Sequence, residues 1–547
     1  MKKFIFISLM DGFENKNVLN IGYLCSALKK VDGLTTGVLF YDFSQLDSIP
    51  DDVIAHDPWM IGISILQYNF EIALKLATML KSKKQDIKIV FGGLEASRYA
   101  EYIINNCEAV DYISLGEGEI SLPDMCKRLL NNESLIGCKG TYYRENGKII
   151  KNEYRELVLD LDTLDFPDRS FCDENHTVFN VIGSRGCYGG CTYCESNCIF
   201  AFNHGPRVRT RSMKNMLDEI ESIVSKGSYA YIGFADYTFS TDNQNSMARL
   251  EELYEGIVER KFNIQFSLFA RAEQITDEYI TLLHKLREVG LDRILVGLEF
   301  ATSEELKLYK KTASLAENER AMNLLYEHGF LNGEAGIIVD IGYIPFHPYA
   351  TFDTLRKNIA FLRKYKIANI NHAILNRMYI SASTKITNQL EKDGLLRHDK
   401  SKPLIDPYCY DFKDPRIGKV YVSFVKAMDV LELQYIPTQI LTNYILYSKH
   451  FEPLFQFSEV NDRYVFVTTC ILGILSEVID TCEKGEVYDH EKSVLFLENK
   501  KKLADVSHEL ITMNSKIAKQ LLKIDKLAIS NMNYVYVKEA KQAIKNC

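Results

Sequence analysis

The sequence predicts an α/β protein in three parts: a doubly wound parallel sheet over about 1–140, a partial or full (β/α) barrel over about 176–385, and a helical domain over 386–547. Apolar runs of strand length alternate with helical runs in the first two parts, which is typical of parallel sheets buried on both faces. From Asp414 onward the runs are long and amphipathic, as in packed helices, which are expected at 415–433, 437–449, 460–484, 487–496 and 503–523. With 547 residues and 46% hydrophobic content, the chain is long enough for several cores.

The first part ends its strands in polar and glycine residues. Strands are expected at 4–9, 36–41, 60–65, 87–91 and 112–114, with helices near 21–30, 70–81, 96–106 and from 121. Ligands of such sheets bind at the carboxyl ends of the strands, where glycine lets a flat ligand approach the backbone. The candidate binding residues there are Ser64, Gly92, Gly93, Gly116, Glu117, Gly118 and Glu119.

A connector over 141–175 joins this sheet to the core. Its Glu145-Asn146-Gly147 turn predicts a hairpin, and an acidic stretch from Leu159 to Asp168 predicts solvated linker turns.

The core reads as a longer strand–helix series. Strands are expected at 178–182, 229–234, 264–269, 293–298, 336–343 and 370–378, and helices at 213–225, 243–260, 277–289, 303–309, 316–328 and 351–365. The chemistry of such barrels takes place at the carboxyl ends of the strands.

Three thiols, Cys187, Cys191 and Cys194, follow the first core strand within eight residues. Three ligands are one fewer than a zinc site or a closed iron–sulfur cluster needs, so the spacing predicts a metal centre with an open position. A zinc knuckle completed by Cys198 is the alternative.

Bulk properties limit the remaining function classes. The net charge of −8, without a basic stripe, argues against duplex nucleic acid as a partner. The amino terminus reads as a buried strand, and the most apolar stretch, Tyr464 to Ile479, is interrupted by polar residues, so no membrane span is expected. Thirteen cysteines, an odd number that is dispersed except for this cluster, fit a reducing compartment, and the protein is expected in the cytoplasm.

The C-x3-C-x2-C spacing with Tyr193 before the third cysteine resembles the signature of the radical S-adenosylmethionine (radical SAM) superfamily. The resemblance implies that the three cysteines hold a 4Fe–4S cluster whose open iron binds S-adenosylmethionine. Tyr193 is implied to bind this cofactor, as are Asp236, Arg271 and Glu299 at successive strand ends. Arg209 and Arg211 are implied to bind its carboxylate. For each of the charged residues a structural ion pair is the alternative.

The first part resembles the cobalamin-binding domain that precedes many radical SAM cores. The segments that carry the resemblance are Asn20–Leu24, Ile61–Ser64, Val90–Gly93 and Asp111–Glu119. The chain has no D-x-H-x-x-G sequence, which implies a base-off cobalamin without a histidine beneath cobalt. A flavodoxin-like domain that has lost its ligand is the alternative.

Two segments depart from the family pattern where substrate is expected: Asp340–Pro348 and Tyr379–Thr384. Tyr379, His347 and Arg377 are candidate substrate contacts, although a packed tyrosine and a hydrogen-bonded histidine explain them more simply. The carboxyl-terminal helices are expected to cap the mouth of the barrel.

Together the resemblances imply a cobalamin-dependent C-methyltransferase that acts on a natural product or peptide. A 5′-deoxyadenosyl radical takes hydrogen from an unactivated carbon, methylcobalamin donates the methyl group, and a second S-adenosylmethionine remethylates cobalt. A flavodoxin or ferredoxin is the implied electron donor. The alternatives are a radical rearrangement, cyclisation or ring contraction without methyl transfer, and a non-catalytic cobalamin- or redox-sensing protein.

Overall fold

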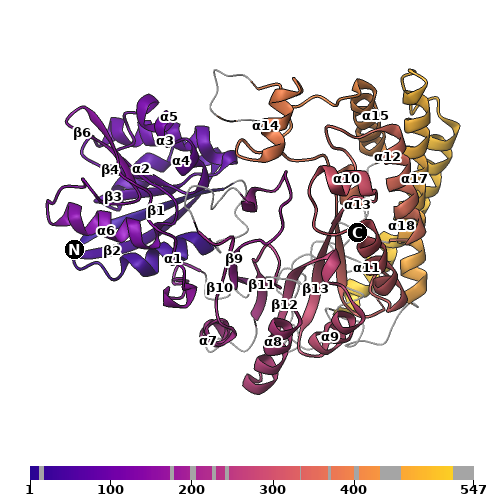
Figure 1. Ribbon diagram of the computed structural model, residues 1–547, viewed down its shortest axis with the longest axis horizontal. Helices are drawn as coiled ribbons and strands as arrows, with labels where there is room; N and C mark the ends of the chain where they lie inside the picture. Colours follow the sequence, from indigo (N-terminus) through magenta and orange to yellow (C-terminus); the bar gives the residue numbers. More distant parts are fainter. Residues whose placement is uncertain are drawn as a thin grey trace.

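The computed structural model describes residues 1–10, 18–172, 178–197, 205–224, 230–240, 246–332, 334–367, 371–398, 404, 406–431 and 457–521. The amino-terminal domain and the helices after residue 414 lie at opposite ends of the molecule, with the second sheet between them (Figure 1).

The first sheet has the strand order β2-β1-β3-β4-β5-β6-β7. Its parallel strands are β1 (Lys2–Met10), β2 (Leu34–Asp42), β3 (Met60–Ser64), β4 (Lys88–Gly92) and β5 (Tyr112–Ser114). The predicted hairpin, β6 (Thr141–Glu145) and β7 (Lys148–Lys151), adds antiparallel to β5. The sheet therefore extends past residue 140, and its order reverses between β1 and β3, where doubly wound sheets bind ligands.

Helices cover both faces of this sheet. Phe4 and Phe6 of β1 pack in a cluster with α1 (Leu19–Leu28) and α6 (Gly118–Leu130), whereas Ile7 and Leu9 pack on the opposite face. The helices of that face are α2 (Ile49–Ala55), α3 (Phe70–Lys83), α4 (Leu94–Arg98) and α5 (Ala100–Asn106). The single helix expected over 96–106 is thus two, because Tyr99 leaves the helical conformation.

The second sheet is open, parallel and five-stranded in the described chain, which makes it a partial barrel. Its strands are β8 (Val178–Val181), β11 (Ala230–Phe234), β12 (Ile264–Arg271), β13 (Leu291–Glu299) and β14 (Ile338–Tyr343). Its helices are α7 (Met213–Val224), α8 (Ser246–Arg260), α9 (Asp277–Glu288), α10 (Ser303–Leu308), α11 (Leu315–Glu327) and α12 (Phe352–Lys364). A small antiparallel pair, β9 (Ser184–Gly186) and β10 (Val208–Thr210), flanks the cysteine loop.

The sixth core strand expected at 370–378 is wrong. The described part of this segment forms the short helix α13 (Asn371–Leu375), and only Arg377 makes an isolated β-bridge, to Phe346. An apolar run this short fits a buried strand and a buried helix equally well.

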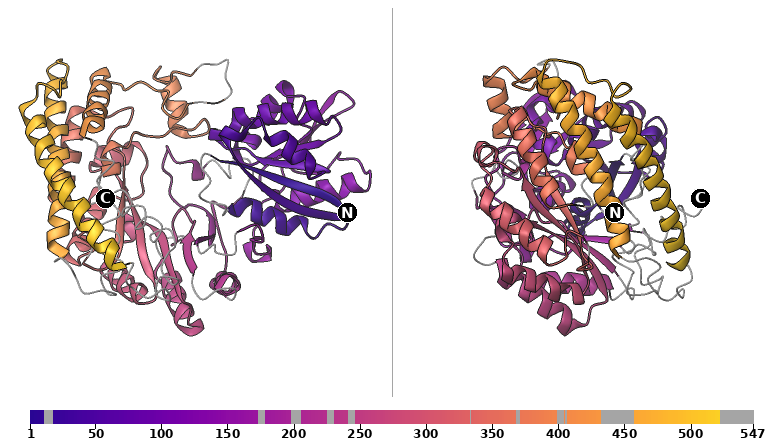
Figure 2. Two further views of the ribbon diagram at one scale, coloured as in Figure 1. Left: turned by 180° about the vertical axis from the view of Figure 1, so that it is seen from behind. Right: turned by 90° about the vertical axis from the view of Figure 1, so that its right-hand side faces the viewer.

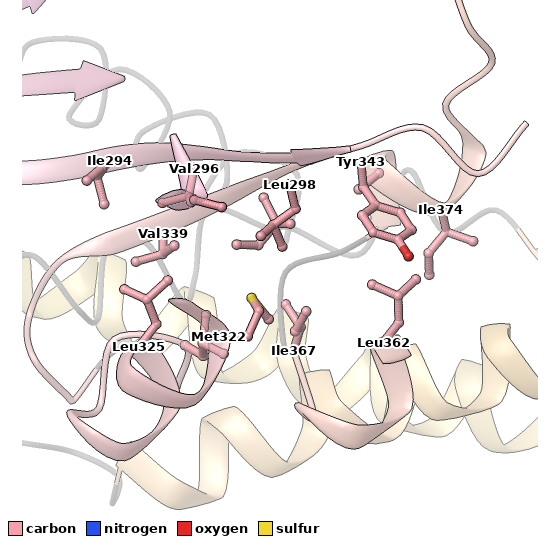
Figure 3. Packing of buried hydrophobic residues seen from close by; sticks show 14 of the residues in the cluster. Ile294, Val296, Leu298, Met322, Leu325, Val339, Tyr343, Leu362, Ile367 and Ile374 are labelled. Carbon is pink, nitrogen blue, oxygen red and sulfur yellow. The ribbon is translucent and has the colours of Figure 1, made fainter. Parts of the chain in front are cut away.

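Serine and threonine fix where the barrel helices begin. Thr276, Thr302, Ser314 and Thr351 each precede a helix and accept a hydrogen bond from a backbone N–H of its first turn. Between the helices and the sheet, Val296 and Leu298 of β13 face Met322 and Leu325 of α11 in the packed core (Figure 3).

The carboxyl-terminal helices are α14 (Lys385–Lys392), α15 (Pro415–Leu431), α17 (Phe457–Glu483) and α18 (Val494–Leu521). The prediction that these helices cap the mouth of the barrel is wrong for α17. This helix packs on the outer helix α12, where Arg356 pairs with Asp480 and Glu483, and it lies away from the first domain (Figure 2). The helix expected over 437–449 lies outside the described residues. Those expected at 487–496 and 503–523 form one helix, α18, which begins only at Val494.

One described helix, Glu459–Glu483, is long and apolar enough to cross a membrane by length and composition. The most apolar window of this helix is 56% buried inside the protein, as in the core helix of a globular domain.

Candidate functional site

A cavity of about 610 Å³ lies between the two sheets. All seven binding residues predicted in the first domain line it: Ser64, Gly92, Gly93, Gly116, Glu117, Gly118 and Glu119. The opposite wall comes from the core, with Ser184, Arg185 and Gly186 of β9 and with Ala235 and Tyr237 after β11. The carboxyl ends of both sheets therefore open onto one chamber.

Two glycines shape the wall of the first domain. Gly93 and Gly116 have φ values of +93° and +72°, in the left-handed region where other residues are strained. A Cβ atom on Gly93 would also lie 3.0 Å from the carbonyl oxygen of Ile65. These positions fit a flat, backbone-contacting ligand such as cobalamin, and the described lining contains no histidine.

Glu117 and Glu119 reach across the chamber to the core. Arg185 donates to both carboxylates, and Arg209 donates to Glu117 through both terminal nitrogens, at 2.9 and 2.7 Å. Burial acts to raise the pKa of Glu117, but the hydrogen bonds and charges of Arg209 and Arg185 outweigh it and lower that pKa. Arg209 is therefore engaged in a structural ion pair.

The three cysteines follow β9 in a loop against the barrel. Cys187 and Cys191 are buried, Cys194 is partly exposed, and all are free thiols. The Gly189 N–H donates to the sulfur of Cys187 at 3.4 Å, and Arg271 Nη1 lies 3.9 Å from the same sulfur. A hydrogen-bond donor and a guanidinium directed at this sulfur complement the negative charge of a cysteine that binds iron.

Among the described residues, no three His, Cys, Asp or Glu side chains converge as ligands of one metal ion. The ligands of a 4Fe–4S cluster do not converge on one metal ion, because each thiolate binds a separate iron atom. Cys198 lies outside the described residues. The assignment of Cys187, Cys191 and Cys194 as cluster ligands stays a prediction that the chemistry of the loop fits.

Arg271 at the end of β12 has one terminal nitrogen without a partner in the described chain. Its Nε donates to Glu273 at 2.6 Å and its guanidinium lies over the Tyr188 ring at 5.0 Å, whereas Nη2 is buried and unpaired. A Cβ on Gly189 would lie 2.6 Å from Nη1, so only glycine fits there without displacing this guanidinium. An orphaned guanidinium nitrogen beside the cysteine loop suits a carboxylate ligand.

Glu299 ends β13 in a strained backbone conformation, with a φ of +71°. Its carboxylate pairs with the buried amine of Lys311 at 3.3 Å. A Cβ on Gly297 would lie 2.9 Å from the Glu299 oxygen, so the strand leaves room for this pair. Tyr193 lies nearby, with its ring edge-on to Phe300.

Asp236 holds the start of the cysteine loop. Its carboxylate accepts from the Gly183 N–H at 2.9 Å and from the Ser184 hydroxyl. Burial raises its pKa to about 6, against the opposing effect of these two hydrogen bonds. Both oxygens have structural partners, and the assignment of Asp236 to S-adenosylmethionine stays a prediction.

The remaining candidates have structural partners. Arg211 pairs with the buried Glu219, and His347 is fully buried between Tyr309 and Glu305. Arg377 donates to the carbonyl groups of Tyr408 and Tyr410 and stacks among four aromatic rings. Tyr379 is 43% exposed and contacts Gln67 of the first domain.

Sequence reasoning missed three site residues: Lys311, Arg185 and Tyr237. Tyr237 lines the cavity and is 46% exposed, although its neighbours Asp236 and Thr238 are buried. The partial burial of Tyr237 raises its pKa, and the nearby Cys194, Glu195 and Cys187 raise it further. A large exposed aromatic within a buried strand-end turn is the signal that identifies it in retrospect.

Models of two protein families match the sequence. The Radical SAM superfamily model matches residues 181–368, and the B12 binding domain model matches residues 17–125. The first match covers β11 to β14 of the second sheet, and the second covers β2 to β5 of the first.

Several curated proteins are similar to the chain. The uncharacterized methyltransferase PH0819 of Pyrococcus horikoshii is 22% identical over 76% of this chain and 88% of its own length. The anaerobic magnesium-protoporphyrin IX monomethyl ester cyclase of Synechocystis is 26% identical over 52% of this chain and 56% of its own. The 4′-phospho-dehydrooxetanocin synthase of Priestia megaterium is 24% identical over 67% and 50%. The chain spans about half the length of the last two.

Solved structures share the whole arrangement. The cobalamin-dependent S-adenosylmethionine radical enzyme OxsB, with aqua-cobalamin and S-adenosylmethionine bound, has a TM-score of 0.68 at 19% identity, over 100% of this chain and 83% of that one. The radical S-adenosylmethionine methyltransferase TsrM of Kitasatospora setae, with cobalamin and a [4Fe-4S] cluster, has a TM-score of 0.57 at 12% identity, over 89% and 100%. These likenesses establish the fold.

Proposed function

The chain belongs to the radical SAM superfamily and carries a cobalamin-binding domain before its radical SAM core, and from this we propose its function. The function is cobalamin-dependent methylation of an unactivated carbon in a natural-product or peptide substrate. The observation that carries this proposal is the shared cavity, which the predicted cobalamin residues line on one side and β9, just before the cysteine loop, lines on the other.

The chain provides separate places for the radical source and the methyl donor. When bound, a reduced 4Fe–4S cluster supplies the electron that cleaves S-adenosylmethionine to a hydrogen-abstracting radical, and cobalamin supplies the methyl group. Cys187, Cys191 and Cys194 would hold the cluster. Arg271, through its unpaired Nη2, would bind the carboxylate of S-adenosylmethionine.

Glu299 and Lys311 would orient the rest of S-adenosylmethionine. A carboxylate can accept from an ammonium group or from ribose hydroxyls, and the ion pair with the buried Lys311 holds this carboxylate in place. The Glu299 side chain is 17% exposed, so a ligand can reach it.

A small molecule or peptide, together with a reductant, completes the reaction. Flavodoxin or ferredoxin is the proposed electron donor, and the cytoplasm is the proposed location. The eleven cysteines in the described chain are all free thiols, which supports a reducing compartment.

The test is anaerobic reconstitution with iron, sulfide and cobalamin, followed by incubation with reductant and methyl-deuterated S-adenosylmethionine. Formation of 5′-deoxyadenosine and S-adenosylhomocysteine, with a deuterated methyl group on the product, supports the proposal. A product of unchanged mass indicates rearrangement or cyclisation, and bound cofactors without either nucleoside product indicate a sensor.

A matched pair of variants tests the ligand assignment. Cys191→Ala is expected to lose the brown iron chromophore, whereas Cys198→Ala is expected to keep it. Zinc instead of iron in the wild type, lost in both variants, would establish the zinc-knuckle alternative.

A further inference from the structure

Four charged side chains, of which Arg209 is buried and the other three are partly buried, connect the cavity between the two sheets to the cysteine loop. They are Glu117 and Glu119 of the first domain and Arg185 and Arg209 of the core, and we call them the arginine bridge. Arg185 Nη1 lies 2.8 Å from Glu117, its Nη2 binds Glu119, and Arg209 Nη2 lies 2.7 Å from Glu117. No side chain of the bridge is more than 15% exposed.

The backbone fixes each end of the bridge. Glu117 and Glu119 follow β5 at the start of α6, and the Val158 N–H donates to Glu117 at 3.1 Å. Arg185 and Arg209 are directly opposite each other in the antiparallel β9–β10 pair. Two facing arginines repel each other unless a carboxylate lies between them, so the pair depends on Glu117.

The bridge also forms part of the cavity wall. Glu117, Glu119 and Arg185 all line the cavity, so a molecule that fills the cavity meets their polar groups directly. Arg185 is two residues before Cys187 and also lies 5.7 Å from the ring of Tyr23, on α1 of the first domain. Any change in its carboxylate partners therefore acts on the backbone that leads into the predicted cluster ligands.

We propose that Arg185 is a positioning residue that couples occupancy of the cobalamin cavity to the geometry of the cysteine loop. The inference rests on the proposed function, because it takes cobalamin as the ligand of the cavity. Cobalamin carries peripheral amide groups, which compete for the Glu119 carboxylate and the Arg185 guanidinium. A purely structural ion pair would hold the domains together but would not respond to this ligand.

The test uses full-length protein with a reconstituted cluster, hydroxocobalamin as the probe, and two measurements. One is the electron paramagnetic resonance (EPR) spectrum of the reduced cluster with and without cobalamin. The other is the cobalamin dissociation constant from absorbance titration. In the wild type, cobalamin is expected to change the line shape of the cluster spectrum.

Arg185→Lys keeps the positive charge but loses the forked guanidinium that binds two carboxylates at once. The variant is expected to fold and to bind iron. Its cluster spectrum is expected not to respond to cobalamin. Glu119→Gln is expected to show the same loss and to weaken cobalamin binding about tenfold. Combining the two is expected to cost less than the sum of the single effects, because both break one contact. Arg128→Lys, paired with Asp124 on the same domain, is the control.

The proposal is overturned if Arg185→Lys responds to cobalamin as the wild type does, or if wild-type protein binds cobalamin without any change in the cluster spectrum. Either result leaves methyl transfer intact. Failure of wild-type protein to bind cobalamin at all would overturn the proposed function as well, and the absorbance titration identifies that case separately.

Discussion

The buried carboxyl group of Asp292 makes the stability of the barrel depend on pH. Asp292 lies at the start of β13 and is fully buried. The Tyr231 hydroxyl donates to Oδ1 at 3.0 Å, whereas Oδ2 has no partner among the described residues. Burial raises the pKa of this group from 3.8 to about 7, although Tyr231 and two nearby arginines act to lower it.

The sign of the effect follows from proton binding. Between about pH 4 and pH 7 the folded protein binds a proton at Asp292 that the unfolded chain has released, so stability falls as pH rises through this window. The difference between a pKa of 3.8 and one of about 7 corresponds to about 4 kcal/mol. Above pH 7 this loss is complete.

Asp292→Asn keeps an acceptor for Tyr231 and removes the ionisation. Relative to the wild type, its free energy of unfolding is therefore expected to gain about 4 kcal/mol between pH 4 and pH 8. Urea unfolding of the barrel at several pH values, followed by circular dichroism, measures this change. Asp353→Asn, on the exposed face of α12, is the matched control and is expected to show no such gain. Parallel curves for Asp292→Asn and the wild type would refute the reasoning.

Two further substitutions test the site. Gly297→Ala places a Cβ 2.9 Å from the Glu299 carboxylate. This substitution is expected to weaken S-adenosylmethionine binding about tenfold in equilibrium dialysis and to leave the iron content unchanged. Loss of iron as well would contradict a local effect. Arg211→Met leaves the fully buried Glu219 with fewer partners and is expected to destabilise the protein by about 3 kcal/mol in urea unfolding. Lys214→Met, which breaks an exposed pair, is its control and is expected to cost less than about 1 kcal/mol.

Most of the fold was predictable because its strands are apolar throughout and its helices carry clear start signals. The strand at 293–298 and the helix at 316–328, for example, were expected within two residues of β13 and α11. The segment 370–378 was not predictable, because its short apolar run lacks the length that distinguishes helix from strand. The packing of α17 on α12 depends on contacts between residues more than 100 positions apart, such as Arg356 with Glu483.

The cavity lining was predictable for the same reason as the sheet. Residues that end adjacent parallel strands must lie together, which brought Ser64, Gly92 and Gly116 to one wall. The partners of charged residues were not predictable, since Glu117 meets Arg185 across 68 positions and a domain boundary. A single sequence shows which residue types can pair but not which ones the fold brings together.

The two sheets direct the carboxyl ends of their strands at each other, and this arrangement constrains the substrate. A carbon that first loses hydrogen and then gains a methyl group must be accessible from the cysteine loop and from the cobalamin cavity without leaving the chamber. Tyr237 lines that cavity and lies close to Cys187 and Cys194. Its neighbours Asp236 and Thr238 are buried and hydrogen-bonded, which anchors the turn that carries the exposed Tyr237. In the proposed reaction we therefore expect the reacting carbon to lie beside this ring, between the two domains that the arginine bridge links.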